Sequence, residues 1–333
     1  MPSTTDAIVA TAPAPVDDET SFVPLDITID DPGPHDLLVE VRAVAVNPVD
    51  VKVRASFDPA DGLKVLGYDA AGVVVGVGAE VTRFGIGDEV YYAGVINRPG
   101  SNAGLQLVDE RIVGHKPSSL SFGDAAALPL TTITAWEVLF DQLHLHKASA
   151  GTLLVVAGAG GVGSMTIQLA RALTDMTVIA TASREDSVAW VRDLGAHHVV
   201  DPRSLRQEIP ALAPHGVDAI FSPHSDGNVE TYAEIMGVHG EVVAIDEPEG
   251  LDTLPLKSKS QTWHWELMFS KPLYRPEDDS QHRLLDDVAA LVDSGRIRST
   301  ANRRLDGFTV ENLREAHRIS ESGGAIGKVV IVR

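Results

Sequence analysis

The chain of 333 residues is long for one domain and favours two, and its 44% hydrophobic and 22% charged residues exclude a disordered protein. A formal net charge of −20 argues against a nucleic-acid surface, and the absence of cysteine excludes disulfides, iron–sulfur clusters and thiolate zinc sites. No apolar run approaches the ~20 residues that span a bilayer, and no basic region with an apolar core opens the chain. We therefore expect a cytoplasmic protein without membrane or nucleic-acid partners.

The first part of the chain has the pattern of a small, irregular β-rich domain. Residues 36–53 alternate or run apolar, and further strand-like runs cover 71–77 and 88–92. Glycine and proline separate these runs, as at Pro32-Gly33-Pro34 and Pro99-Gly100, which is typical of turns between short strands.

The pattern changes near residue 120, where helices are predicted over 124–129 and 134–139. Strands and helices then alternate, which predicts parallel strands with crossover helices on both faces of a sheet. The predicted strands are 153–156, 177–181, 198–200, 217–221 and 241–245, the predicted helices are 164–170, 186–194 and 228–236, and the tail adds helices over 284–292 and 310–320 and a strand over 328–332.

A glycine-rich turn joins the predicted strand 153–156 to the following helix. Gly158, Gly160 and Gly163 spell GxGxxG. One glycine permits the tight turn, one lets the backbone approach a pyrophosphate, and one lets the helix pack closely on the strand. Free N–H groups and the positive end of the helix dipole would then face the phosphates, so the turn predicts dinucleotide binding.

The end of the predicted strand 177–181 indicates which dinucleotide binds. An acidic residue there would favour NAD, but the chain has Ser183 and Arg184. A hydroxyl and a guanidinium suit a 2′-phosphate, so we expect NADPH over NADH. The alternative is that Ser183 caps the next helix and Arg184 is solvated.

Several ordered motifs resemble the medium-chain dehydrogenase/reductase superfamily, in particular its zinc-independent quinone oxidoreductase branch and the subgroup called zinc-type alcohol dehydrogenase-like. The resemblance covers nearly the whole chain after the first ~20 residues. It rests on residues 45–54 (AVNPVDVKVR), 67–74 (GYDAAGVV), 84–90 (FGIGDEV), 125–135 (AAALPLTTITA), the glycine turn and the terminal 327–330 (GKVV).

The resemblance implies an α/β fold class with two domains. A GroES-like β domain would comprise residues 1–125 and 266–333, and a doubly wound Rossmann domain with a parallel sheet would comprise residues 126–265. It also implies a homodimer formed through the edge of the Rossmann sheet, and an active site where the two domains meet.

Zinc-dependent relatives hold a catalytic metal with Cys, Gly-His-Glu and Cys or Asp. Here the first ligand position falls in residues 47–50, and Gly67-Tyr68-Asp69 replaces Gly-His-Glu. A tetrahedral zinc site cannot be built from these residues. Among the 12 histidines, the pairs His144/His146 and His197/His198 are expected to be surface or helix-edge residues rather than ligands. We therefore expect no zinc.

The resemblance further implies hydride transfer to a quinone or to the β-carbon of an enone. Donors aimed at the carbonyl oxygen would then lower the barrier. Asn47, Lys52 and Tyr68 are the candidate catalytic residues. Each has an alternative: Asn47 could hold a turn, Lys52 could be a solvated strand residue or a phosphate contact, and Tyr68 could pack.

The same resemblance supplies further cofactor contacts. Thr134 would lie near the nicotinamide-side phosphate at the entry of a helix, or be an ordinary helical hydroxyl. Gly161 and Val162 would offer backbone N–H groups to the pyrophosphate. Ser222 and Ile245 would lie at the carboxyl edge of the sheet, where ligands of open parallel sheets bind. Lys328 would reach the cofactor or be a surface charge.

Two other functions remain open at this stage. One is zinc-free reduction of simple ketones or aldehydes, and the other is a dinucleotide-binding redox sensor with little catalysis. The aromatic stretch 263–269 is interpreted as packing or a subunit interface rather than a ligand contact.

Overall fold

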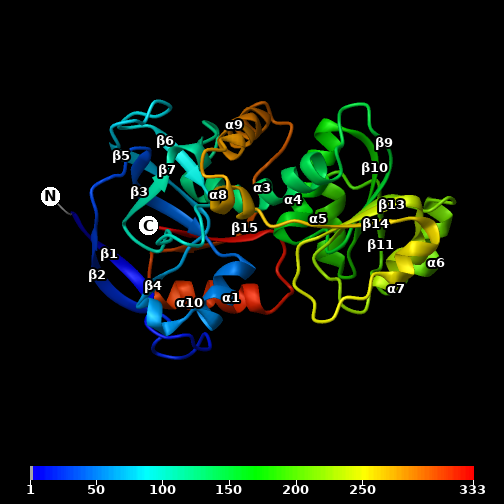
Figure 1. Ribbon diagram of the computed structural model, residues 1–333, viewed down its shortest axis with the longest axis horizontal. Coiled ribbons are helices and arrows are strands. Elements are labelled where there is room, and N and C mark those ends of the chain that lie inside the picture. Colours follow the sequence, from blue (N-terminus) through cyan, green and yellow to red (C-terminus); the bar gives the residue numbers. More distant parts are fainter. Residues whose placement is uncertain (1–2) are drawn as a thin grey trace. The chain divides into compact units, whose positions relative to one another are not determined.

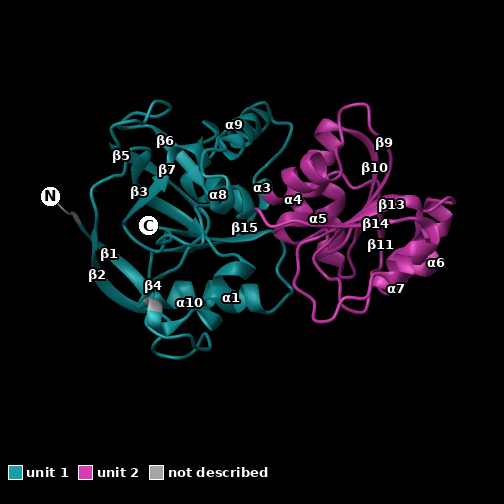
Figure 2. Cartoon of the chain, viewed as in Figure 1, with its two compact units in different colours: residues 1–133, 269–333 teal, residues 134–268 magenta. Residues whose placement is uncertain are grey.

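The computed structural model of the protein describes residues 3–333 (Figure 1). The chain divides into two compact units (Figure 2). Unit 1 contains the chain up to Ile133 together with Phe269–Arg333, and unit 2 contains Thr134–Met268. The boundary falls inside helix α3 (Pro129–Trp136), whereas the sequence placed it at 125/126, which lies within helix α2 (Phe122–Ala126).

Unit 1 is built on two β-sheets. The larger one has seven strands in the order β15-β16-β3-β5-β6-β8, with β7 paired to β3, and the smaller one has the order β2-β1-β4. The strands are β1 (Ser3–Ala10), β2 (Val23–Ile29), β3 (Asp36–Ala45), β4 (Lys64–Val65), β5 (Ala70–Val77), β6 (Glu89–Tyr92), β7 (Leu105–Asp109), β8 (Val113–His115), β15 (Ala301–Asp306) and β16 (Lys328–Val332).

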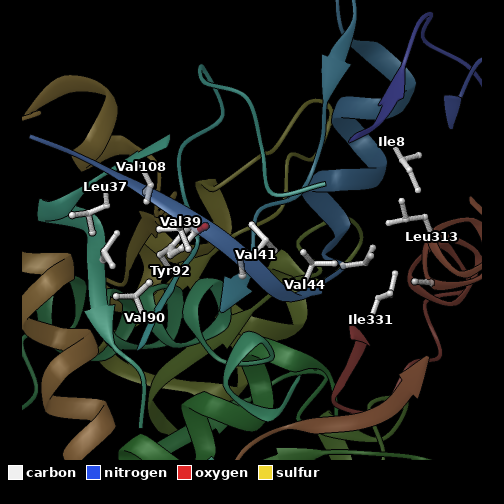
Figure 3. Packing of buried hydrophobic residues seen from close by; sticks show 14 of the residues in the cluster. Ile8, Leu37, Val39, Val41, Val44, Val90, Tyr92, Val108, Leu313 and Ile331 are labelled. Carbon is white, nitrogen blue, oxygen red and sulfur yellow. The ribbon is translucent and has the colours of Figure 1, made fainter. Parts of the chain in front are cut away.

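Strand β3 forms the centre of the unit 1 core. Its residues alternate in burial, so that Leu37, Val39 and Val41 point to one face while their neighbours are less buried. That period of two is what a strand with one buried face requires. Figure 3 shows these side chains packing with Val90, Tyr92 and Val108, and residues of the terminal segment, Leu313 and Ile331, belong to the same cluster.

The C-terminal segment completes unit 1. Strand β16 pairs antiparallel with β3, in the register Val330 opposite Ala45, and β15 adds to it in parallel. The remaining helices of the unit are α1 (Pro48–Ser56), α8 (Ser270–Tyr274), α9 (Ser280–Asp293) and α10 (Val310–Glu321), with short 3-10 turns at Pro59–Asp61 and Glu110–Ile112.

Helix α1 corrects the sequence prediction that residues 36–53 are strand-like throughout. Strand β3 ends at Ala45, and the helix begins at Pro48. Pro48 suits the first helical position because its ring presets φ and its missing N–H has no acceptor there. Asp50 Oδ2 accepts from the Asn47 N–H at 2.8 Å and so caps the first turn, and this local capping overrides the run of valines.

Unit 2 is a six-stranded parallel sheet in the order β11-β10-β9-β12-β13-β14. Numbered from its first strand this is 3-2-1-4-5-6, the order of a Rossmann fold, which reverses between β9 and β12. The strands are β9 (Ala150–Val155), β10 (Asp175–Thr181), β11 (His198–Val200), β12 (Val217–Ser222), β13 (Met236–Ala244) and β14 (Thr262–Trp265). The helices are α4 (Gly161–Leu173), α5 (Glu185–Asp193), α6 (Leu205–Leu212) and α7 (Val229–Ile235), with a π-helical turn at Glu137–Gln142 and a 3-10 turn at Leu254–Lys259.

The fold class predicted from the sequence is therefore confirmed: a separate β unit accompanies a parallel, doubly wound sheet. Within the part of the chain that the structure describes, no helix is both long and apolar enough to cross a membrane.

Candidate functional site

The glycine turn lies between β9 and α4, at the carboxyl end of the first strand of the sheet. Two hydrogen bonds tie it to the end of β10: the Ala157 N–H donates to Thr181 Oγ1 at 2.8 Å, and the Gly158 N–H donates to the Thr181 carbonyl at 3.1 Å. The turn is thus fixed next to the point where the strand order reverses, which is where dinucleotides bind in such sheets.

The three glycines of the turn differ in what a side chain would meet. A Cβ on Gly163 would lie 2.5 Å from the Ala157 carbonyl oxygen, and a Cβ on Gly158 would lie 2.9 Å from the Ala180 Cβ. These two glycines are required by packing. A Cβ on Gly160 would meet only the Ala157 oxygen, at 3.4 Å, and its φ of −69° suits any residue. The protein's own packing therefore leaves open the space that a Cβ on Gly160 would fill.

Free backbone donors surround Gly160. It is the N-cap of α4, and among the described residues no side chain caps this helix. The first N–H groups of a helix have no intrahelical acceptor, so the amides of Gly161 and Val162 are available to a ligand. Together with the open space above Gly160, this arrangement fits a pyrophosphate.

Ser183 and Arg184 follow β10, and both are exposed. The helix cap is formed by Ser187, whose hydroxyl donates to the Arg184 carbonyl at 2.8 Å and accepts from the Arg184 N–H at 3.1 Å. Ser183 therefore does not cap α5, contrary to the alternative considered from the sequence. The Arg184 guanidinium lies 3.3 Å from Asp186 in an exposed pair, which a ligand phosphate could displace at little cost.

The other predicted cofactor residues of unit 2 lie in different settings. Thr134 is buried near the end of α3 rather than at the entry of a helix. Ser222 ends β12, and its hydroxyl is 2.9 Å from the His224 carbonyl and 2.8 Å from the Tyr232 hydroxyl. Ile245 follows β13 directly and is half-buried.

Unit 1 contains a second constellation, in which four polar residues from distant segments meet in the interior. Asn47, Asp50, Asp69 and Lys328 are each at least nine-tenths buried. The Asn47 amide donates to Asp69 Oδ2 at 2.9 Å and to the Tyr68 carbonyl at 3.3 Å. Its oxygen accepts from Lys328 Nζ, so the whole Asn47 amide is engaged inside unit 1.

Lys328 is paired rather than exposed. Its ammonium donates to the Val46 carbonyl at 2.8 Å and lies 3.1 Å from Asp69 Oδ2. The other Asp69 oxygen accepts from the Leu130 N–H at 2.8 Å. Burial raises the pKa of Asp69, and the Lys328 charge opposes that shift. A direct contact between Lys328 and a cofactor would compete with these acceptors.

Asp50 is the second buried carboxyl of this centre. It accepts from the Asn47 N–H at 2.8 Å and from the Gly67 N–H at 3.0 Å. Burial raises the pKa of Asp50 to about 7, because these two hydrogen bonds offset only part of the loss of hydration. The sequence analysis missed Asp50, although the spacing Asn47-Pro48-Val49-Asp50 is a helix-capping signal that could have identified it.

Tyr68 follows Gly67 and lies between the two carboxylates in sequence. Its side chain is fully buried, and its ring meets Phe269 edge-on at 5.7 Å between centroids. Within the described residues its hydroxyl has no hydrogen-bond partner, and burial raises the pKa of the phenol. The centre therefore contains a protonated phenol with an unused donor.

Lys52, the third predicted catalytic residue, lies apart from this network on α1, and its side chain is exposed. Its position on a helix corrects the strand environment assumed from the sequence.

Two known families match parts of the chain. Residues 33–128 match the alcohol dehydrogenase GroES-like domain, and residues 161–267 match the zinc-binding dehydrogenase family. A zinc-type alcohol dehydrogenase-like protein of Staphylococcus epidermidis is 38% identical over 330 residues, which cover 95% of this chain and 96% of that protein.

Two further relatives extend the comparison. A 2-methylene-furan-3-one reductase of Solanum lycopersicum is 31% identical over 317 residues, covering 92% of this chain and 74% of that protein. A solved protein of Rhizobium etli, provisionally described as a zinc-dependent alcohol dehydrogenase, superimposes with a TM-score of 0.95 at 47% identity and covers 99% of this chain and 98% of its own.

The names of these relatives raise the question of zinc, and the residues of the unit 1 centre do not fit it. The positions that resemble metal ligands carry Asn47, Tyr68 and Asp69, the chain has no cysteine, and the Lys328 ammonium lies among them. Zinc sites in proteins use thiolates, imidazoles and carboxylates, and an ammonium in the same place repels a metal ion. Among the side chains that the structure describes, no cluster of three or more His, Cys, Asp or Glu residues is placed to hold a metal.

Proposed function

Because this chain belongs to the medium-chain dehydrogenase/reductase superfamily, and is accordingly an oxidoreductase, we propose that it is an NADPH-dependent, zinc-independent reductase of quinones or α,β-unsaturated carbonyls. The observation that carries the proposal is the turn at Gly160, where an added Cβ would meet no atom closer than 3.4 Å and where helix α4 begins. The tomato relative's name supports the acceptor class, because a 2-methylene-furan-3-one is itself a conjugated enone.

The residues of the turn would hold the cofactor by its phosphates. The amides of Gly161 and Val162 donate to the pyrophosphate, and the α4 dipole favours its charge. Arg184 leaves Asp186 to pair with the 2′-phosphate, and Ser183 adds a hydroxyl. When bound, NADPH supplies a hydride to the acceptor.

The unit 1 centre would stabilise the negative charge that then develops on the acceptor's carbonyl oxygen. Tyr68 is the donor that the geometry favours, because its hydroxyl is unpartnered within the described residues while the Asn47 amide is fully engaged. We assign to Asn47 the role of fixing the Tyr68 backbone. A donor fixed in advance at that oxygen lowers the barrier without reorganisation during the reaction. Lys52, exposed on α1, stays a candidate for contacting a charged group at the surface.

A substrate panel tests the reaction class. The purified protein is mixed with NADPH and either methyl vinyl ketone, a benzoquinone or butanone, and loss of reduced nicotinamide is followed by absorbance. We expect turnover with the enone or the quinone and little with butanone. Equal rates on methyl vinyl ketone and butanone would favour a simple ketone reductase, and tight NADPH binding without turnover on any acceptor would indicate a redox sensor.

The cofactor preference is tested at Arg184. Substituting Arg184→Ala removes a bidentate phosphate partner, so we expect the Kd for NADPH to rise about tenfold and the Kd for NADH to stay within about twofold. Arg192→Ala provides a matched control, because Arg192 is exposed in the last turn of the same helix. An equal loss of both cofactors, measured by titration calorimetry, would contradict the assignment.

A further inference from the structure

Lys328 is a buried cation with a complete set of oxygen acceptors. Only 5% of the residue is exposed. Its ammonium has three N–H donors, and three oxygens lie around it: the Val46 carbonyl, Asn47 Oδ1 and Asp69 Oδ2. The sheet sets this position, because the Lys328 backbone N–H donates to the Thr300 carbonyl at 2.8 Å and β16 pairs with β3 just beyond.

These oxygens converge from two segments that flank Tyr68 in the fold. Val46 and Asn47 join β3 to α1, and Asp69 follows Tyr68 directly. The network then anchors Tyr68 and its two neighbours in sequence, Gly67 and Asp69. Asp50 holds the Gly67 N–H, Asn47 holds the Tyr68 carbonyl, and Asp69 is held by Lys328 and the Leu130 N–H.

Removing the ammonium would leave this network incomplete. Asn47 Oδ1 would lose its donor, and Asp69 would become a buried carboxylate without a counter-charge, which is a costly arrangement. The amide of Asn47 could then rotate and release the Tyr68 carbonyl. The charge of Lys328 is therefore linked to the position of Tyr68 through two side chains.

We propose that the Lys328 ammonium is the resident cation of this centre, taking the place that a metal ion would need, and that it is the positioning residue for the Tyr68 hydroxyl. Its effect on turnover rests on the proposed function, whereas its role as the resident cation does not. The residue contacts no reacting atom and acts through Asn47 and Asp69.

A charge-balanced set of variants tests the positioning role. Lys328→Met keeps the volume but removes the charge, Asp69→Asn removes the opposite charge, and the double variant removes both partners of this ion pair. We expect each single variant to lower Tm by several degrees, and the double variant to recover most of that loss, because replacing both partners of a buried pair is nearly neutral. This recovery keeps the test valid even if Lys328→Met alone does not fold.

Turnover separates positioning from simple charge neutralisation. In the double variant we expect kcat to remain about tenfold or more below the original while the Kd for NADPH stays within about threefold. Recovery of kcat to the original value together with Tm would overturn the positioning role, because charge balance alone would then suffice.

Metal content provides a readout that is independent of activity. After dialysis against zinc and then buffer, we expect only traces of zinc in the purified protein, and no change of Tm on adding EDTA. Stoichiometric zinc in the original protein that is absent from Asp69→Asn would overturn the proposal that Lys328 is the resident cation. If the protein reduces neither enones nor quinones, the proposed function fails. The zinc content and the Tm series still test whether Lys328 is the resident cation of the centre.

Discussion

Several charged residues of unit 1 are buried in its interior and contact partners from distant segments. Helix α1 buries Asp50 and Arg54, four residues apart, while its valines are only half-buried. Arg54 donates to the Ala14 carbonyl at 3.2 Å, lies 2.9 Å from His317 Nδ1 and pairs with Glu321. Each of these buried charges needs partners from distant segments, because an unpaired charge in the interior is expensive.

Stability should depend on pH through His317. Burial and the neighbouring Arg54 lower the pKa of His317 from 6.5 to about 3. The unfolded chain therefore binds a proton in a range where the folded chain does not, so this residue's contribution is complete above pH 6.5 and is lost as the pH falls towards 3. As the pH falls through that window, we expect the free energy of unfolding to decrease by roughly 1.4 kcal/mol per pH unit because of His317.

The measurement is urea unfolding of the original protein and of His317→Gln between these pH values. Glutamine keeps an acceptor for Arg54 but cannot titrate, so the variant should show a shallower decline below pH 6.5. Parallel curves for the two proteins would contradict the role of His317.

Tyr68→Phe tests the donor of the proposed reaction. Removing one preorganised donor to a developing oxyanion typically costs about 100-fold in kcat. Since the phenol has no partner within the described residues, we expect no loss of Tm. Tyr92→Phe is the matched control, because the Tyr92 hydroxyl is also buried without a partner there but belongs to the core around Val39 (Figure 3). Equal kcat values for Tyr68→Phe and Tyr92→Phe would remove Tyr68 from the mechanism.

At the level of elements, the two units differ in how directly the sequence predicts them. In unit 2 the alternation of apolar strands and helices is local, and the observed elements follow it from β9 to β13, except that helix α6 was not predicted. In unit 1 the valines from Val46 to Val53 suggested an extended strand, yet Pro48 and the hydrogen bond from the Asn47 N–H to Asp50 start a helix. A specific capping arrangement outweighs a weak apolar alternation, because it satisfies backbone groups that a strand ending there would leave unpaired.

Two substitutions in the glycine turn should have opposite effects on Tm and on NADPH affinity. Gly163→Ala places a Cβ 2.5 Å from the Ala157 oxygen, so we expect a lower Tm because α4 must move away from the turn. Gly160→Ala meets nothing closer than 3.4 Å, so Tm should hold, while the Kd for NADPH should rise at least about tenfold as the methyl group displaces the pyrophosphate. Thermal melts and NADPH titration of both variants distinguish these effects. Unchanged NADPH affinity in Gly160→Ala would mean that the phosphates bind elsewhere.

At the level of the whole molecule, unit 2 is inserted into the chain of unit 1, so that the segment after Met268 returns to complete the β-rich unit. The parallel sheet of unit 2 ends at β14, which pairs with β13 alone among the described strands. Trp265 in this strand and Leu267 just after it are each 50% exposed. An open strand edge flanked by exposed apolar residues favours pairing with another chain, and we propose that two copies pair along β14.

Trp265→Glu tests this dimer. Two copies would bring the new carboxylates together across the pairing edge, so we expect a shift from dimer to monomer in light scattering coupled to size-exclusion chromatography. Leu254→Glu is the control, because Leu254 is a 67% exposed apolar residue of the same unit outside β14. A dimer that survives in Trp265→Glu, or that dissociates equally in Leu254→Glu, would place the interface elsewhere.

The features that depend on neighbouring residues could be predicted from the amino-acid sequence alone. These include the glycine turn at Gly158–Gly163, the parallel sheet and the absence of thiolate ligands, and each follows from local spacing or from composition. Which residues meet around Tyr68, by contrast, depends on the tertiary structure. Asn47 and Lys328 meet although they lie 281 positions apart, and neither residue's local pattern indicates the other. Such a pairing exists because burial forces polar groups to find each other across the fold, and the sheet register, rather than the spacing of residues along the chain, decides which groups meet.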